Sequence, residues 1–178
     1  MVEFSITQYG KPLAESEYSI DLEQKVFTST KYDLVLDFTE LDYWVFKTVD
    51  NCNFKTGFGC NFKTGYACSF DTGSHCHFYT VNHCNFHTGG DCNFDTHSIC
   101  IFRTGSNCTF DTGRWCTFMT ANKCIFKTEG SCTFSLYDIN TCEFKSYHDG
   151  ISIILDRSNN EAYKLTKEFI QLQKINNG

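Results

Sequence analysis

Residues 52–65 read CNFKTGFGCNFKTG, and the eight-residue unit C-x-F-x-T-G-x-x that opens there continues through most of the chain. Eleven cysteines follow one another at intervals of eight, the twelfth follows a two-residue insertion, and a Phe stands two places after each Cys. An internal period of this kind outranks every other fold signal in a sequence. The repeated positions are Cys52, Cys60, Cys68, Cys76, Cys84, Cys92, Cys100, Cys108, Cys116, Cys124, Cys132 and Cys142, with Phe54, Phe62, Phe70, Phe78, Phe86, Phe94, Phe102, Phe110, Phe118, Phe126, Phe134 and Phe144.

The spacing inside the unit predicts a strand. Cys, Phe and Thr occupy its first, third and fifth positions, which is the two-residue period of a strand with one buried face. Gly at the sixth position is expected to supply the positive φ of a turn, and it would break a helix. Parallel stacking of such strands about 4.8 Å apart pairs the backbone and forms internal ladders of Cys and Phe. The predicted fold is all-β, a parallel β-solenoid.

Two coil sizes fit this pattern. The position after Cys favours coils of three octads, because Ile101 and Ile125 are three octads apart, whereas Gly57 and Gly73 favour coils of two octads. We favour two octads per coil, since opposed strands about 10 Å apart leave the volume that paired Phe rings would fill. The triangular coil of three octads is the alternative.

The octapeptide-repeat solenoid is predicted over residues 36–146. Before Cys52 the unit persists in degenerate form as Trp44-Val45-Phe46 and as Leu36-Asp37-Phe38. Residues 1–35 contain short alternating runs and are expected to form a β-rich cap, because an uncovered end would expose strand edges. The cap and the repeat belong to one folding unit.

Residues 147–178 are predicted to form the second cap. Ile151 to Leu155 read as a strand, and the apolar residues that follow, at steps of three and four, predict a short helix over the last coil. Those residues are Ala162, Leu165, Phe169 and Leu172. A hairpin using Ala162 to Thr166 is the alternative.

Charge and hydropathy exclude several classes of protein. The formal charge is -6, and residues 52–146 carry seven acidic and seven basic side chains, so no basic surface for nucleic acid is expected. No apolar run is long enough to predict a membrane span, and the first residues show no signal-peptide pattern. We therefore expect no nucleic-acid or membrane partner and a reducing, cytoplasmic location.

The twelve cysteines do not predict a metal site or disulfides. Equivalent strand positions give parallel side chains in a row, whereas zinc needs converging ligands and a disulfide needs a shorter separation than stacked strands allow. Buried reduced thiols are also poor nucleophiles. His77, His87 and His97 occupy different positions of the octad, so they form no matched row. We predict no catalytic, metal-binding or cofactor-binding residue, no cofactor, and a protein that is not an enzyme.

The start of each unit, as in Cys52-Asn53-Phe54, is distantly similar to a pentapeptide repeat, although the period is eight instead of five. The chain resembles more closely the C-x-F-x-T-G octapeptide-repeat proteins, an uncharacterised phage or viral type, over residues 36–146. The resemblance implies a solenoid and suggests a viral origin, which would place the protein in the host cytoplasm. It implies no activity.

The leading functional hypothesis is a structural or interaction protein that presents a rigid surface to an unidentified protein partner. Only positions where octads differ can encode a partner, and aromatic side chains on corners are expected to face solvent. Tyr, Trp and Arg are the residue types enriched at binding hot spots. The candidate interaction residues are Phe58, Tyr66, Arg114 and Trp115. A monomer or an end-to-end homodimer is expected. The alternatives are an inhibitor of a host DNA-binding or defence protein, which the balanced charge of the repeat disfavours, and an ice-binding protein, which the irregular outward positions disfavour.

Overall fold

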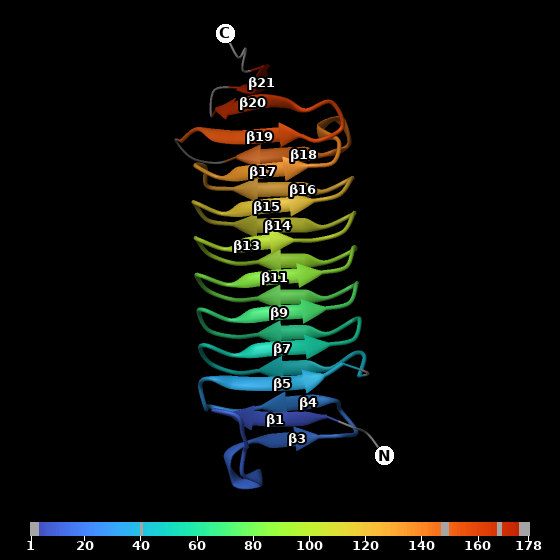
Figure 1. Cartoon of the computed structure of the whole chain (residues 1–178), viewed down its shortest axis with the longest axis vertical. Coiled ribbons are helices and arrows are strands. Elements are labelled where there is room, and N and C mark those ends of the chain that lie inside the picture. Colours follow the sequence, from blue (N-terminus) through green and yellow to red (C-terminus); the bar gives the residue numbers. More distant parts are fainter. Residues whose placement is uncertain (1–3, 40, 147–149, 167–168, 175–178) are drawn as a thin grey trace.

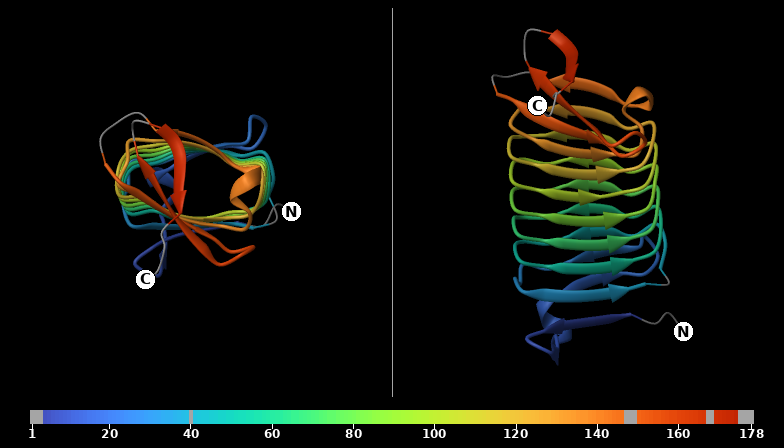
Figure 2. Two further views of the ribbon diagram at one scale, coloured as in Figure 1. Left: turned by 90° about the horizontal axis from the view of Figure 1, so that it is seen from above. Right: turned by 45° about the horizontal axis from the view of Figure 1, so that its top comes forward.

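The computed structural model describes residues 4–39, 41–146, 150–166 and 169–174, and over these ranges the chain forms a flattened β-solenoid made of two facing sheets (Figures 1 and 2). Sheet A contains, in spatial order, β2 (Lys11–Pro12), β1 (Ser5–Gln8), β5 (Leu34–Phe38), β7 (Asn53–Thr56), β9 (Ser69–Thr72), β11 (Asn85–Thr88), β13 (Ile101–Arg103), β15 (Thr117–Thr120), β17 (Thr133–Leu136), β19 (Ser152–Asp156), β20 (Glu161–Thr166) and β21 (Phe169–Lys174).

Sheet B contains, in spatial order, β18 (Glu143–Ser146), β16 (Ile125–Thr128), β14 (Thr109–Thr112), β12 (Asn93–Asp95), β10 (His77–Tyr79), β8 (Asn61–Lys63), β6 (Val45–Lys47), β4 (Val26–Thr28) and β3 (Ser19–Asp21). Two single 3₁₀ turns, η1 (Glu15–Glu17) and η2 (Ile139–Thr141), interrupt the strands. The described residues form no helix long and apolar enough to cross a membrane.

The register of the strands settles the coil size. Asn53 of β7 pairs in parallel with Ser69 of β9, and Asn61 of β8 pairs in parallel with His77 of β10. In both pairs the partner lies two octads further along the chain. Each coil therefore holds two octads, one in each sheet, and the three-octad alternative is wrong.

The Phe side chains fill the space between the sheets. Within one sheet, rings on adjacent coils stack face to face, as Phe70 does on Phe86 with centroids 4.9 Å apart and planes at 3°. Across the sheets, neighbouring rings meet edge to face, as Phe78 and Phe86 do at 5.1 Å and 74°. Both arrangements are favoured by the quadrupole of the aromatic ring. The two columns of rings thus interlock into one continuous core.

The N-terminal end is built from β1 to β4 and joins the first coil. β1 pairs antiparallel with β5, whereas β4 already runs parallel to β6 and aligns Phe27 with Phe46. The predicted alignment of Leu36-Asp37-Phe38 with C-x-F is wrong by two residues, because Leu36 pairs with Phe54. The corner between β5 and β6 is two residues longer than a regular corner. Counting octads backwards from Cys52 does not reveal this insertion.

The predicted C-terminal helix is wrong. Residues 161–166 form β20, which pairs antiparallel with β19, and β21 extends the same sheet. Leu165 is 3% exposed and Tyr163 packs against the core, so the inward residues are two apart instead of three or four. The open edge of β19 offers backbone hydrogen bonds along a whole strand, and this outweighs the helical stripe that begins at Ala162. The alternative hairpin is the one that forms.

Candidate interaction surface at the corners of the coil

Each coil turns twice, and the two corners are named here by the strand before them. Corner 1 follows a strand of sheet A, as at residues 57–59, and corner 2 follows a strand of sheet B, as at residues 65–67. The last residue of a regular corner has positive φ, for example 61° at Ile99 and 56° at Trp115. That conformation costs a residue other than Gly about 1 to 2 kcal/mol. The turn that was expected at the sixth position of the octad therefore lies at the eighth.

The glycines at the sixth position serve a different purpose from the one predicted. A Cβ atom built on Gly113 would lie 2.3 Å from the Oγ atom of Ser98 on the preceding coil. A Cβ atom on Gly65 would lie 1.7 Å from the Oδ1 atom of Asp50. At these two positions a polar side chain from the preceding coil occupies the space that a Cβ atom would take, whereas at Gly105 the backbone of Gly90 occupies it.

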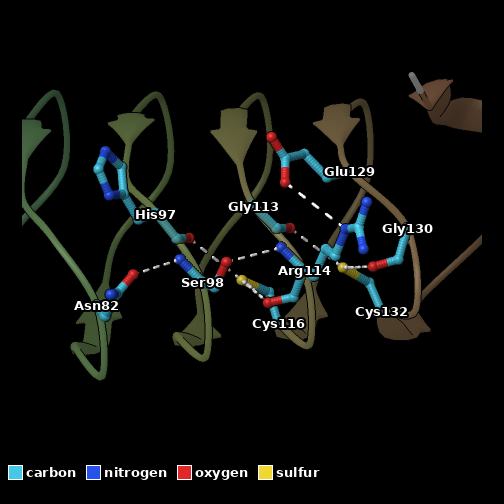
Figure 3. Close-up of polar contacts among 9 residues, drawn as sticks. All are labelled: Asn82, His97, Ser98, Gly113, Arg114, Cys116, Glu129, Gly130 and Cys132. Carbon is cyan, nitrogen blue, oxygen red and sulfur yellow. Dashed lines mark hydrogen bonds and ion pairs between the residues drawn. The ribbon is translucent and has the colours of Figure 1, made fainter. Parts of the chain in front are cut away.

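These polar side chains brace one corner against the next (Figure 3). The backbone N–H of Ser98 donates to Oδ1 of Asn82 at 2.8 Å, and the backbone N–H of Arg114 donates to Oγ of Ser98 at 3.0 Å. Asp42 and Asp50 accept in the same way from backbone N–H groups one coil later. The corners are consequently fixed relative to one another by side chains as well as by the sheets.

The thiols stabilise the inside of the same corners. Sγ of Cys116 lies 3.6 Å from the carbonyl oxygens of both His97 and Arg114, and Cys132 donates similarly to Gly113 (Figure 3). Burial raises the pKa of the Cys60 thiol, which keeps it protonated as a donor. All twelve cysteines are free, and eleven are buried. The thiols link the carbonyls of successive coils, and eleven of them are enclosed inside the solenoid.

The structure separates the four candidate interaction residues. Phe58 lies on corner 1, whereas Tyr66, Arg114 and Trp115 lie on corner 2. Three full coils separate Tyr66 from Arg114. Phe58 packs edge-on against Tyr43, which ends corner 1 of the preceding coil, with ring centroids 4.9 Å apart. Only Arg114 and Trp115 are brought together.

Sequence reasoning missed Ile99. It occupies the same corner position as Trp115 on the preceding coil, and the two side chains are 43% and 61% exposed. A β-branched residue is rare at positive φ, so the backbone at Ile99 is strained. Because such strain is common at functional sites, it singles out Ile99 and Trp115 as a candidate pair. Ile99 could have been noticed in the sequence as a large apolar residue at the eighth position of an octad. The strand pattern, however, does not reveal which of the three corner residues adopts the left-handed backbone conformation.

The polar groups around this pair complete the surface. Nε of Arg114 lies 3.8 Å from Oε2 of Glu129 on the next coil, and this exposed ion pair directs the guanidinium towards that coil (Figure 3). A hollow of about 670 Å³ lies beside it and is lined in part by Asp95, His97 and Glu129. Corner 2 therefore offers an exposed apolar pair, a positioned arginine and a polar hollow.

The strain at Ile99 can be measured. Replacing Ile99 by Gly is expected to leave the free energy of unfolding unchanged or to raise it by up to about 1 kcal/mol, because relief of the left-handed backbone offsets the added entropy of Gly. Ile101 is equally exposed, at 43%, but extended within β13. Ile101→Gly should lower stability by about 1 kcal/mol in urea denaturation. Equal losses for both variants would contradict the strain at Ile99.

No protein-family model, no curated protein and no solved structure matches this chain. We therefore infer a candidate function from the geometry of the corners alone.

Proposed function

We propose that the protein is a non-enzymatic scaffold that binds another protein through corner 2, around Ile99, Arg114 and Trp115. The observation that carries this proposal is the 61% exposure of Trp115 on a braced corner, next to a second exposed apolar side chain. Trp and Arg are among the three residue types most enriched at binding hot spots, the third being Tyr. A partner that covered this pair would remove apolar surface from water and gain a charged contact at the same place.

The rigidity of the corner supports this role. Ser98 accepts from the N–H of Arg114, and Cys116 donates to the carbonyl of the same residue. A surface that is already ordered loses little conformational entropy when a partner binds. The side chains of Arg114 and Trp115 are thus presented in a fixed frame.

The chemistry of the cysteines supports a role without catalysis. The Cys116 thiol is 1% exposed and is oriented towards backbone carbonyls, which opposes formation of a reactive thiolate. The resemblance to octapeptide-repeat proteins extends the proposal to a phage or viral chain that acts on a host protein in the host cytoplasm.

Affinity capture from the native host tests the proposal. The full chain and its Trp115→Ala variant serve as baits, and Phe58→Ala on the opposite corner is the matched aromatic control. The wild type and Phe58→Ala are expected to enrich the same protein, and Trp115→Ala to recover at least about tenfold less of it. Circular dichroism establishes that both variants are folded.

Two results would overturn the proposed function. One is undiminished capture of the enriched protein by Trp115→Ala, which would place binding elsewhere. The other is a failure of the wild-type chain to enrich any protein above an unrelated bait.

A further inference from the structure

A second feature lies on the opposite edge of the solenoid, at corner 1 beyond β11, β13 and β15, which stack on one face below β19 (Figure 1). There a shallow hollow, open to solvent and about 380 Å³ in volume, is lined by His87, Arg103, Gly105, Met119 and Arg157, among others. Two of the three arginines of the chain thus face one small hollow. None of its described lining residues is acidic.

The corner residues that line the hollow are small. Gly105 stands at the sixth position of its octad, and a Cβ atom there would lie 2.7 Å from the backbone nitrogen of Gly90. Ala121 occupies the equivalent position one coil later. Neither residue fills this part of corner 1, and the long side chains of Arg103, Met119 and Arg157 border it.

Arg157 reaches this hollow from far along the sequence. It directly follows β19, and Nη2 of its guanidinium donates to the carbonyl oxygen of Thr120 at 2.6 Å. This hydrogen bond fixes the guanidinium in place and leaves its remaining N–H donors available. A guanidinium anchored by one edge is preorganised to bind with the other.

Arg103 contributes the second positive charge. It points outward from β13 in register between His87 and Met119. Among the described residues, neither Arg103 nor Arg157 lies within ion-pairing distance of a carboxylate, whereas Arg114 is paired with Glu129. The nearest acidic group in this row, Asp71, faces His87 at 3.6 Å. Two uncompensated guanidinium groups at one hollow repel each other unless an anion lies between them.

We propose that this hollow is a binding site for a phosphate group, carried either by free phosphate or by a phosphate monoester. The planar fork of each guanidinium matches two oxygens of a tetrahedral phosphate, and a dianion balances the two charges. Met119, which is 45% exposed at the border of the hollow, offers an apolar contact to the organic group of an ester. The site is independent of the protein-binding corner, since it lies on the opposite edge.

Isothermal titration at constant ionic strength tests this site, with inorganic phosphate and phenyl phosphate as the two probes. The full chain should bind with a stoichiometry of about one, and Arg103→Gln and Arg157→Gln should each weaken binding at least about tenfold. Arg114→Gln removes the same charge from the opposite edge and should leave binding unchanged. Because Arg103 is an outward strand residue, its variant remains informative even if Arg157→Gln loosens the C-terminal strands.

The two probes identify the source of the phosphate. Tighter binding of phenyl phosphate, lost in Met119→Ala, would assign the site to a monoester, and equal or weaker binding would assign it to free phosphate. Absence of saturable binding by either probe would overturn the proposal. An equal loss in Arg103→Gln and Arg114→Gln would also overturn it, because it would reveal a general effect of net charge.

Discussion

Replacing Phe86 by Ala is expected to lower the free energy of unfolding by about 3 to 5 kcal/mol, the cost of removing a large buried ring. Phe86 is 2% exposed and stacks between Phe70 and Phe102 at centroid distances of 4.9 and 4.8 Å. It also meets Phe78 and Phe94 edge-on, each at 5.1 Å. Four ring contacts are lost together, and the neighbouring coils are held too firmly by their hydrogen bonds to close the cavity.

Urea denaturation followed by circular dichroism measures this loss. Asp95→Ala is the matched control, because Asp95 points outward from β12, the next strand along the chain, which lies in the facing sheet. This substitution should change stability by no more than about 0.5 kcal/mol. Lys63→Ala, also outward, should behave like Asp95→Ala. Comparable losses at Phe86 and at either outward position would show that the assignment of inner and outer faces is wrong.

The second large effect is expected at Gly105. Its replacement by Ala should lower stability by about 1 to 3 kcal/mol, the range found when a packed site receives an extra group. The new Cβ atom would lie 2.7 Å from the nitrogen and 2.9 Å from the Cα atom of Gly90. Both are backbone atoms held by the stacked coils, so neither can move aside as a flexible side chain would.

The matched control for Gly105 is one coil away. Ala121 already carries a methyl group at the equivalent position, and Ala121→Gly should change the midpoint of thermal unfolding much less than Gly105→Ala does. If Gly105→Ala unfolds at the same temperature as the wild type, the close approach of the coils at corner 1 is not a constraint on the sequence.

The repeat predicted the fold because the two-residue alternation and the eight-residue period agree at every octad. Cys92, Phe94 and Thr96 lie inside the solenoid, and Asn93 and Asp95 lie outside it. The number of octads per coil could not be predicted in the same way. Coils of two octads and of three octads preserve the alternation equally, and only the packing of rings between two facing sheets distinguishes them.

The ends were less predictable because they hold single copies of each element. One insertion before Trp44 was enough to shift the alignment of Leu36, and the stripe from Ala162 to Leu165 fits a helix until the open edge of β19 is taken into account. In both places a tertiary contact outweighs a local pattern. A segment without a repeat offers no second copy against which to check its register.

The candidate surface was predictable residue by residue but not as a group. Trp115 and Arg114 stand out in the sequence as large side chains at a corner, and the structure leaves both accessible. The two-octad coil determines which of these residues are neighbours. It places Phe58 and Tyr66 on opposite corners, and it places Ile99 and Trp115 at the same corner on successive coils. Arg157 could not be linked to Arg103 at all, because their proximity depends on the fold of the C-terminal end.

Because each coil holds two octads in parallel register, the length of the solenoid can change only by whole coils. Gain or loss of a whole coil leaves each remaining strand with an equivalent neighbour and shifts the two ends relative to each other by about 4.8 Å. Gain or loss of a single octad would instead move everything beyond it to the opposite sheet, so that β19 would follow the wrong corner. Insertion of a pair of octads would therefore lengthen the solenoid while both ends keep their fit.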